Sequence, residues 1–270
     1  MRWDPTQYSL FSDHRGMPFL DLVGRVNHAD PRVVVDLGCG PGDLTRLLAE
    51  RWPDAGVLGI DSSADMVQRA NDQADPPPNL RFETGDIRDF SPADDVDVDV
   101  VVTNAVLQWV PGQAELVQKW AQALQPGAWL ALQVPGNFGS PAHTLLRELA
   151  GSNAWRDQLG GVLRHTDVVS EPEEYLRMLS EAGMTADVWE TTYQHVLTGP
   201  DPVLQWLKGT GLRPVLNALS DDDAAAFVEQ YAALLRGAYP EEPWGTVFGF
   251  RRIFAVGVKT GRSRSKDPAG

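Results

Sequence analysis

Three glycines at alternate positions follow a short apolar run in the segment VVVDLGCGPG. Gly38, Gly40 and Gly42 continue from Asp36 at intervals of two residues. Glycine adopts backbone conformations that other residues avoid, and it lets ligand atoms approach where a Cβ would clash. At the carboxyl end of a strand, such a loop is typical of a nucleotide-cofactor site. The spacing is D-x-G-x-G-x-G, which differs from the G-x-G-x-x-G of dinucleotide sites.

Further polar residues come at the ends of the next two apolar runs. Asp61 ends the run GVLGID, where a carboxylate can accept hydrogen bonds from both hydroxyls of a ribose. Asp86 and Ile87 suit the amino group and the ring face of an adenine. Each has a structural alternative: Asp61 as a cap of the helix at Ser62, Asp86 as a turn aspartate, and the nearby Met66 as a core residue.

The elements that must position these residues alternate along the first half of the chain. Short apolar runs predict strands, and segments with apolar residues at helical spacing predict helices. The predicted strands are 32–38, 56–61, one after the loop 76–86, 96–104 and 128–137, and the predicted helices are 42–52, 63–72 and 113–124. This order predicts an α/β fold with a doubly wound, Rossmann-like, mostly parallel seven-stranded sheet.

The second half predicts a helical cap inserted before the last strand. It contains a helix at 171–184, a strand at 185–197, helices over 201–239 that are broken at GTGLRP, and a final strand at 251–259. The predicted segments are an N-terminal lid or helix at 1–30, a cofactor-binding core at 31–137, the remaining sheet elements with the cap at 138–250, the last strand, and a disordered tail at 260–270.

Composition excludes several classes of protein. The 270 residues carry a formal net charge of −14, which argues against a nucleic-acid partner. Cys39 is the one cysteine, so no internal disulfide can form, and its place among the glycines favours a packing role. No apolar run approaches the roughly 18 residues of a membrane span, and no leader pattern is present, so we expect a cytoplasmic protein, with a monomer as the default.

Four segments in order resemble the class I S-adenosylmethionine-dependent methyltransferases: VVVDLGCGPG, GIDSS, GDIRDF and NAVLQWV. The resemblance implies S-adenosyl-L-methionine as methyl donor and S-adenosyl-L-homocysteine as product. It places the glycine loop and Asp36 around the methionine part, Asp61 at the ribose, Asp86 and Ile87 at the adenine, and Asn104 beside the amino-acid part. The candidate cofactor residues are Asp36, Gly38, Gly40, Gly42, Asp61, Ser62, Met66, Asp86, Ile87 and Asn104.

Methyl transfer from a sulfonium demands alignment and exclusion of water more than proton transfer. A general base is needed only when the acceptor atom carries a proton. A carboxylate has a reference pKa of about 4 and arrives ionised. The five histidines are scattered, and no metal-ligand spacing is present. This pattern is compatible with a carboxylate acceptor, for which no residue is required as a base.

Segments outside the cofactor motifs resemble the trans-aconitate 2-methyltransferase family over nearly the whole chain. They are RWDPTQYSLFSDHRGMP, LQWVPG, QVPGNFGSPAH, VWETTYQHVLTG and WLKGTGLRPVL. The resemblance implies esterification of one carboxylate of the tricarboxylate trans-aconitate, which gives a monomethyl ester.

A tricarboxylate requires cations, and arginine suits a carboxylate because its planar fork binds both oxygens. The candidate acceptor-binding residues are Arg15, His165, His195, Trp206, Arg213 and Arg252, and the candidate orienting residues are Tyr8, Trp109 and Tyr193. The structural alternative is an ion pair for each arginine and a core position for each aromatic residue. Pro214 disfavours helix at Arg213, which predicts that Arg213 lies in a break between two cap helices.

Two other functions remain open from the sequence. One is a class I methyltransferase acting on a different small-molecule acceptor, and the other is a non-catalytic module that binds S-adenosyl-L-methionine. Arginines in the cap favour an acidic acceptor, whereas an apolar cap would favour the first alternative.

Overall fold

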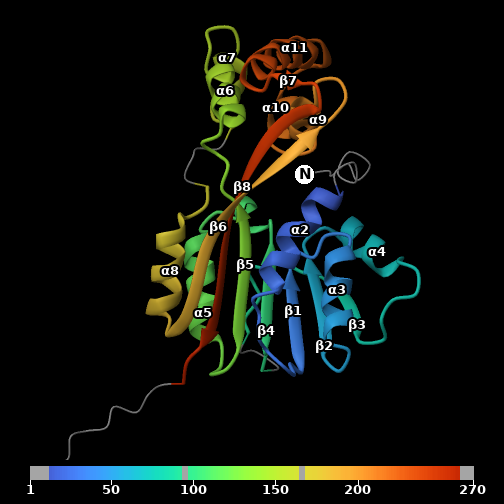
Figure 1. Cartoon of the computed structure of the whole chain (residues 1–270), viewed down its shortest axis with the longest axis vertical. Coiled ribbons are helices and arrows are strands. Elements are labelled where there is room, and N and C mark those ends of the chain that lie inside the picture. The colour runs from blue at the N-terminus through green and yellow to red at the C-terminus, as the bar shows by residue number, and fades with distance from the viewer. Residues whose placement is uncertain (1–11, 93–96, 164–167, 262–270) are drawn as a thin grey trace, which may run out of the picture. The chain divides into compact units, whose positions relative to one another are not determined.

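The computed structural model describes residues 12–92, 97–163 and 168–261, with side chains from residue 16 onward (Figure 1). The chain forms two compact units. The sheet unit comprises Gly16–Val134, Val169–Glu190 and Ile253–Gly270, and the helical unit comprises Met1–Arg15, Pro135–Val168 and Thr191–Arg252. Tyr8 and His165 lie outside the described residues, and so does the side chain of Arg15.

Five parallel strands build most of the sheet, in the order β3-β2-β1-β4-β5 (Figure 1). They are β1 (Val33–Leu37), β2 (Gly56–Asp61), β3 (Leu80–Thr84), β4 (Val100–Asn104) and β5 (Trp129–Pro135). The central strands are rich in valine because both of their faces are covered: Val34, Val100 and Val101 are 0% exposed. The predicted Rossmann-like, mostly parallel sheet is confirmed, although in the described residues it has eight strands rather than the predicted seven.

The sheet continues from β5 through β8 (Gly245–Lys259) to β6 (Met184–Leu197), and the short β7 (Glu241–Glu242) pairs with β8. Backbone hydrogen bonds join Ala128 to Lys259 and Gly136 to Arg251, so β8 runs antiparallel to β5. The strand predicted at 251–259 begins six residues earlier, at Gly245. Gly245 and Gly249 weakened the strand signal of GTVFGF, in which the alternate residues Thr246, Phe248 and Phe250 are buried.

The helices of the sheet unit match the predicted ones within a few residues. The predictions at 42–52, 63–72, 113–124 and 171–184 are confirmed as α3 (Asp43–Arg51), α4 (Ala64–Asn71), α5 (Gln113–Ala123) and α8 (Pro172–Glu181), and α2 (Ser12–Val23) and the 3₁₀ turn η1 (Leu107–Trp109) complete the set. Ser63, rather than Ser62, caps α4, since its Oγ accepts a hydrogen bond from the Met66 N–H at 3.4 Å.

The helical unit contains α6 (Pro141–Ala150), α7 (Arg156–Leu159), α9 (Pro202–Lys208), α10 (Arg213–Ala218) and α11 (Asp221–Ala238). Its own hydrophobic core includes Leu146, Trp206 and Phe227. The prediction that Pro214 keeps Arg213 out of a helix is wrong, because α10 begins at Arg213. Proline is well tolerated in the first helical turn, where the N–H that it lacks has no partner within the helix.

None of the helices in the described ranges combines the length and the apolar character that a membrane crossing requires. In the same ranges, no three His, Cys, Asp or Glu side chains gather in a way that could hold a metal ion.

Candidate functional site

The three glycines of the loop between β1 and α3 all adopt left-handed conformations, with φ angles of 83° at Gly38, 56° at Gly40 and 87° at Gly42. A Cβ on Gly38 would lie 2.2 Å from a methyl carbon of Val106, and one on Gly42 would lie 2.6 Å from the Phe82 ring. These two glycines therefore permit close packing. A Cβ on Gly40 would meet no atom of the described residues within 4 Å, so within that part of the chain Gly40 alone of the three faces open space.

Asp61 ends β2 and holds the glycine loop in place. One carboxylate oxygen accepts the Gly40 N–H at 2.9 Å, and the other accepts the Ser63 N–H at 2.9 Å. A carboxylate has about four acceptor positions, so each oxygen keeps capacity for another donor. The side chain is half-buried. It can therefore fix the loop and also accept hydrogen bonds from a ligand hydroxyl.

Asp36 lies in β1 and is 3% exposed. Its carboxylate accepts a hydrogen bond from the Thr45 hydroxyl of α3 at 2.6 Å. Burial raises the pKa of Asp36 to about 6, an effect that the Thr45 hydrogen bond opposes and the charge of Asp61 reinforces. Negative charge is thus concentrated beneath the glycine loop, which favours a cationic group on the ligand.

The raised pKa of Asp36 predicts a pH-dependent stability. The folded-state pKa of Asp36 lies above the unfolded value of 3.8, so protonated Asp36 stabilises the folded state. This contribution to the free energy of unfolding is fully present below pH 3.8 and is lost as the pH rises through 6. Relative to Asp36→Asn, which keeps an acceptor for Thr45, the free energy of unfolding of the wild type should fall by about 2 kcal/mol between about pH 4 and pH 7. Urea unfolding of both proteins across this range measures the difference, and parallel curves would contradict the assignment.

Asp86 and Ile87 follow β3, and the prediction that 76–86 is a loop before the third strand is wrong, because β3 lies within that segment. Asp86 also has a partner that was not predicted. Its carboxylate accepts the Arg88 backbone N–H at 2.9 Å and binds the Arg88 guanidinium through both oxygens. These hydrogen bonds hold the pKa of Asp86 below its ordinary value. Ile87 is 6% exposed and Met66 is half-buried, whereas Ser62 is exposed.

The end of β4 carries an unusual backbone and unsatisfied polar atoms. Ala105 has a φ of 58°, which is rare for a residue other than glycine. Its N–H donates to the Gln133 carbonyl at 2.9 Å, and its carbonyl accepts the Gln108 side-chain amide at 2.6 Å. Among the described residues, the Oδ1 of Asn104 and both amide atoms of Gln133 are buried without a hydrogen-bond partner. Asn104 was predicted, whereas Gln133 was missed because it lies within the apolar run of β5.

Several candidate acceptor residues gather in the helical unit. The Tyr193 and His195 rings lie 6.3 Å apart, and the His195 and Trp206 rings 5.1 Å apart. The Arg252 guanidinium carbon lies 4.3 Å from the centre of the Phe250 ring. His195 and Arg252 are each 6% exposed, and Trp206 is 1% exposed and belongs to the core of this unit.

The remaining candidates lie in other segments. Trp109 ends η1 in the sheet unit and is half-buried, and Arg213 begins α10 in the helical unit and is also half-buried. Arg251 is held in place by a hydrogen bond from its guanidinium to the Gly136 carbonyl at 3.1 Å.

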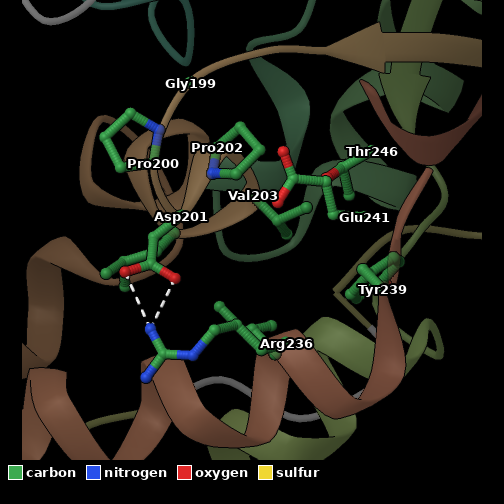
Figure 2. A pocket seen from close by; sticks show the side chains of 11 residues that line it. Gly199, Pro200, Asp201, Pro202, Val203, Arg236, Tyr239, Glu241 and Thr246 are labelled. Carbon is green, nitrogen blue, oxygen red and sulfur yellow. Dashed lines mark hydrogen bonds and ion pairs between the residues drawn. The ribbon is translucent and has the colours of Figure 1, made fainter. Parts of the chain in front are cut away.

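A separate pocket of about 260 Å³ lies in the helical unit (Figure 2). Figure 2 shows the Arg236 guanidinium facing the Asp201 carboxylate, to which it bonds at 2.7 and 2.9 Å. The described residues that line it are Gly199, Pro200, Asp201, Pro202, Val203, Leu204, Leu235, Arg236, Tyr239, Glu241 and Thr246. They include none of the candidate residues named from the sequence, so this pocket offers control positions for tests of the acceptor site.

Comparison with known proteins gives relatives over nearly the whole chain. The family model for a methyltransferase domain matches residues 34–127. A trans-aconitate 2-methyltransferase from Streptomyces coelicolor is 54% identical over 95% of this chain and 86% of its own length. The protein of the same name from Streptomyces avermitilis is 52% identical over 95% and 97%, respectively.

Solved structures share the fold at low sequence identity. The YcgJ protein from Bacillus subtilis has a TM-score of 0.57 at 17% identity, covering 92% of this chain and 99% of its own. The geranyl diphosphate C-methyltransferase from Streptomyces coelicolor, solved with S-adenosyl-L-homocysteine, has a TM-score of 0.54 at 16% identity, covering 94% and 82%.

Proposed function

This chain belongs to the trans-aconitate 2-methyltransferase family, and from that premise we propose that it transfers a methyl group from S-adenosyl-L-methionine to one carboxylate of trans-aconitate. The product is the monomethyl ester. The observation that carries this proposal is that the similarity extends over 95% of the chain, whereas the general methyltransferase model covers only residues 34–127. The helical unit, where acceptor specificity is expected, is therefore similar to that of the named relatives.

The described residues fit the proposed methyl donor. Gly40 faces open space, and the Asp61 carboxylate beside it keeps acceptor capacity for a ribose diol. Asp36 places negative charge below the loop, which suits the positive charges of a sulfonium and an ammonium group. Ile87 supplies an apolar surface for an adenine ring.

Our further assignments for the donor follow from its chemistry. Asp86 accepts a hydrogen bond from the adenine amino group, and Asn104 contacts the amino-acid end. Ser62 and Met66 flank the nucleoside. When bound, S-adenosyl-L-methionine supplies a methyl group that is activated by its sulfonium. The residues of this chain align that group and exclude water from it.

The chemistry requires no general base. As the carbon–oxygen bond forms, the carbon–sulfur bond breaks and its electron pair remains on sulfur. The negative charge of the carboxylate and the positive charge of the sulfonium are both lost, and no proton moves. An ionised carboxylate is the main form of such a group at neutral pH. The protein therefore has to orient the acceptor and hold its other carboxylates.

For the acceptor, we assign this holding role to cations of the helical unit. Arg213 and Arg252 bind remote carboxylates, His195 is a supplementary donor, and Tyr193 and Trp109 orient the reacting group. Arg15, His165 and Tyr8 are further candidates that lie outside the described residues or side chains. The protein acts on a small molecule, and we propose a cytoplasmic monomer.

Asp61→Ala should weaken the binding of S-adenosyl-L-methionine and of S-adenosyl-L-homocysteine by about 1–3 kcal/mol each, as is typical for lost hydrogen bonds to a charged group. Two effects combine, because the substitution removes the acceptor for the ribose and also frees the Gly40 and Ser63 amides. Titration calorimetry measures both affinities. Asp43→Ala, at an exposed acidic residue of the neighbouring helix, is the control and should bind both ligands normally. Unchanged affinity in Asp61→Ala would contradict the assignment.

The decisive test of function is turnover. Purified protein is incubated with methyl-labelled S-adenosyl-L-methionine and a panel of acids, phenols and hydroxyl-bearing metabolites. We expect labelled ester with trans-aconitate and much less product with monocarboxylic acids. Label in a phenol or an alcohol would favour a different acceptor, and binding without turnover on the whole panel would favour a non-catalytic module.

A further inference from the structure

Two carboxamide side chains stand side by side at the ends of β4 and β5. Asn104 and Gln133 are direct partners in the parallel register, and side chains at paired positions point to the same face of a sheet. Gln133 is only 1% exposed, yet both its Oε1 and its Nε2 lack hydrogen-bond partners among the described residues. The Oδ1 of Asn104 is also buried and unsatisfied. Buried polar atoms without partners are uncommon, because each has lost its hydrogen bonds to water without replacing them.

The register also fixes which face these side chains share. Val102 pairs with Asp36 on one side and with Ala131 on the other. Asn104 and Gln133 lie two residues further along the same two strands, and positions two residues apart point to the same face. The carboxamide pair is therefore on the face that carries the Asp36 carboxylate, closer to the carboxyl ends of the strands. Ligands of doubly wound sheets bind beyond those ends.

The backbone beside the pair is strained. Ala105 follows Asn104 with a φ of 58°, a left-handed conformation that brings its Cβ too close to the following carbonyl oxygen. It is held by hydrogen bonds to the Gln133 carbonyl and from the Gln108 side chain. Strain of this kind persists where the surroundings enforce it, and it concentrates at ligand sites. The strain and the unsatisfied amides are separate observations that point to the same place.

The unsatisfied atoms indicate the chemistry of the ligand. Each carboxamide offers one acceptor oxygen and one donor amide, and the buried set here comprises two acceptors and one donor. A carboxylate alone would use the donor and leave both acceptors unsatisfied. An α-amino acid zwitterion uses all of them, because its ammonium donates to the oxygens and its carboxylate accepts from the amide. The nearby Asp36 carboxylate adds attraction for the ammonium.

We infer that Gln133, together with Asn104, binds the α-amino acid end of the methyl donor. Gln133 is thus a positioning residue for the transfer, and the inference rests on the proposed function. It is most directly tested by Gln133→Met, which keeps the length of the side chain and removes both polar atoms. The probes are S-adenosyl-L-homocysteine and 5′-methylthioadenosine, which has the same nucleoside and thioether but no amino-acid end.

In Gln133→Met we expect S-adenosyl-L-homocysteine to bind about 10- to 100-fold more weakly, as for the loss of hydrogen bonds to charged groups. Binding of 5′-methylthioadenosine should change less than about twofold, and the melting temperature should stay the same or rise, since buried unsatisfied atoms are removed. Gln113→Met is the matched control. Gln113 is also buried, but it accepts from the Tyr175 hydroxyl at 2.9 Å and donates to Ser170 at 3.2 Å. That variant should melt at a lower temperature and bind both probes normally.

Several results would overturn the inference. If Gln133→Met weakens the binding of both probes equally, or if its melting temperature falls as that of Gln113→Met does, Gln133 has a structural role. If it binds both probes normally but has a higher KM for trans-aconitate, the pair binds the acceptor. If the wild type binds both probes and methylates trans-aconitate, and Gln133→Met changes the affinity for neither probe, the inference fails while the proposed function stands. Failure of wild type to bind S-adenosyl-L-homocysteine would overturn both.

Discussion

Gly40→Ala is expected to weaken binding of S-adenosyl-L-homocysteine by about 2–3 kcal/mol, or roughly 30- to 150-fold, because its methyl group would enter the space proposed for the ligand. The free energy of unfolding should fall by only about 1–2 kcal/mol, the cost of a side chain in the left-handed conformation. A Cβ at this position meets no atom of the residues that the structure describes within 4 Å, so no clash with them adds to that cost. Titration calorimetry and urea unfolding measure the two effects.

Gly38→Ala supplies the contrast, since Gly38 is two residues away and is also left-handed. Its added Cβ would lie 2.2 Å from Val106, whose branched side chain has little freedom to move. The conformational cost and the overpacking together should lower the free energy of unfolding by about 2–5 kcal/mol. Equal destabilisation by the two substitutions would show that the open space at Gly40 is filled by protein in solution. Undiminished affinity in Gly40→Ala would show that the ligand binds elsewhere.

Local patterns were sufficient to predict the elements that carry the cofactor site. Buried parallel strands are continuous apolar runs, so VVVDL and VVVTN stood out and their ends located Asp36 and Asn104. The loop glycines were identified by their spacing. The different roles of these glycines could not be predicted from the spacing, because the close contact of Gly38 with Val106 and the open space at Gly40 depend on the segment that follows β4.

Features that depend on pairing between distant strands could not be read from the sequence. Gln133 lies in ALQVP, where its neighbours suggest only a buried strand, and its relation to Asn104 appears once β4 and β5 are in register. The partner of Asp86, Arg88, is only two residues away in sequence but is one of many exposed arginines. The early start of β8 was missed because glycines in GTVFGF weaken the strand signal, although alternate residues are buried.

The acceptor site was the part least determined by local patterns. Tyr193, His195 and Trp206 were named separately, and the structure brings their rings together. The deep burial of Trp206 agrees with the alternative of a core position. Because Trp206 is a core residue, its substitution would also disturb packing, so the charged residues are the more informative targets for mutation.

Arg213→Ala should lower kcat/KM for trans-aconitate by about 2–4 kcal/mol, or roughly 30- to 1,000-fold, by analogy with the loss of one partner of a buried charge pair. The affinity for S-adenosyl-L-homocysteine should be nearly unchanged, because the proposed donor residues lie in the sheet unit and Arg213 belongs to the helical unit. Arg213→Lys should also lose much of the activity, since lysine keeps the charge but lacks the planar fork that binds both oxygens of a carboxylate.

The comparison that isolates anion recognition uses trans-aconitate and a monocarboxylic analogue with each protein. If Arg213 holds a remote carboxylate, wild type prefers the tricarboxylate and Arg213→Ala loses that preference, while turnover of the analogue changes little. Arg236→Ala is the matched control in the same unit, because Arg236 is bound to Asp201 at the pocket of Figure 2. Each variant removes one positive charge from a protein whose formal net charge is −14. A general electrostatic effect on an anionic substrate would therefore appear in both Arg213→Ala and Arg236→Ala. Full activity and full discrimination in Arg213→Ala would make this residue structural and would leave Arg252 as the cation to test next.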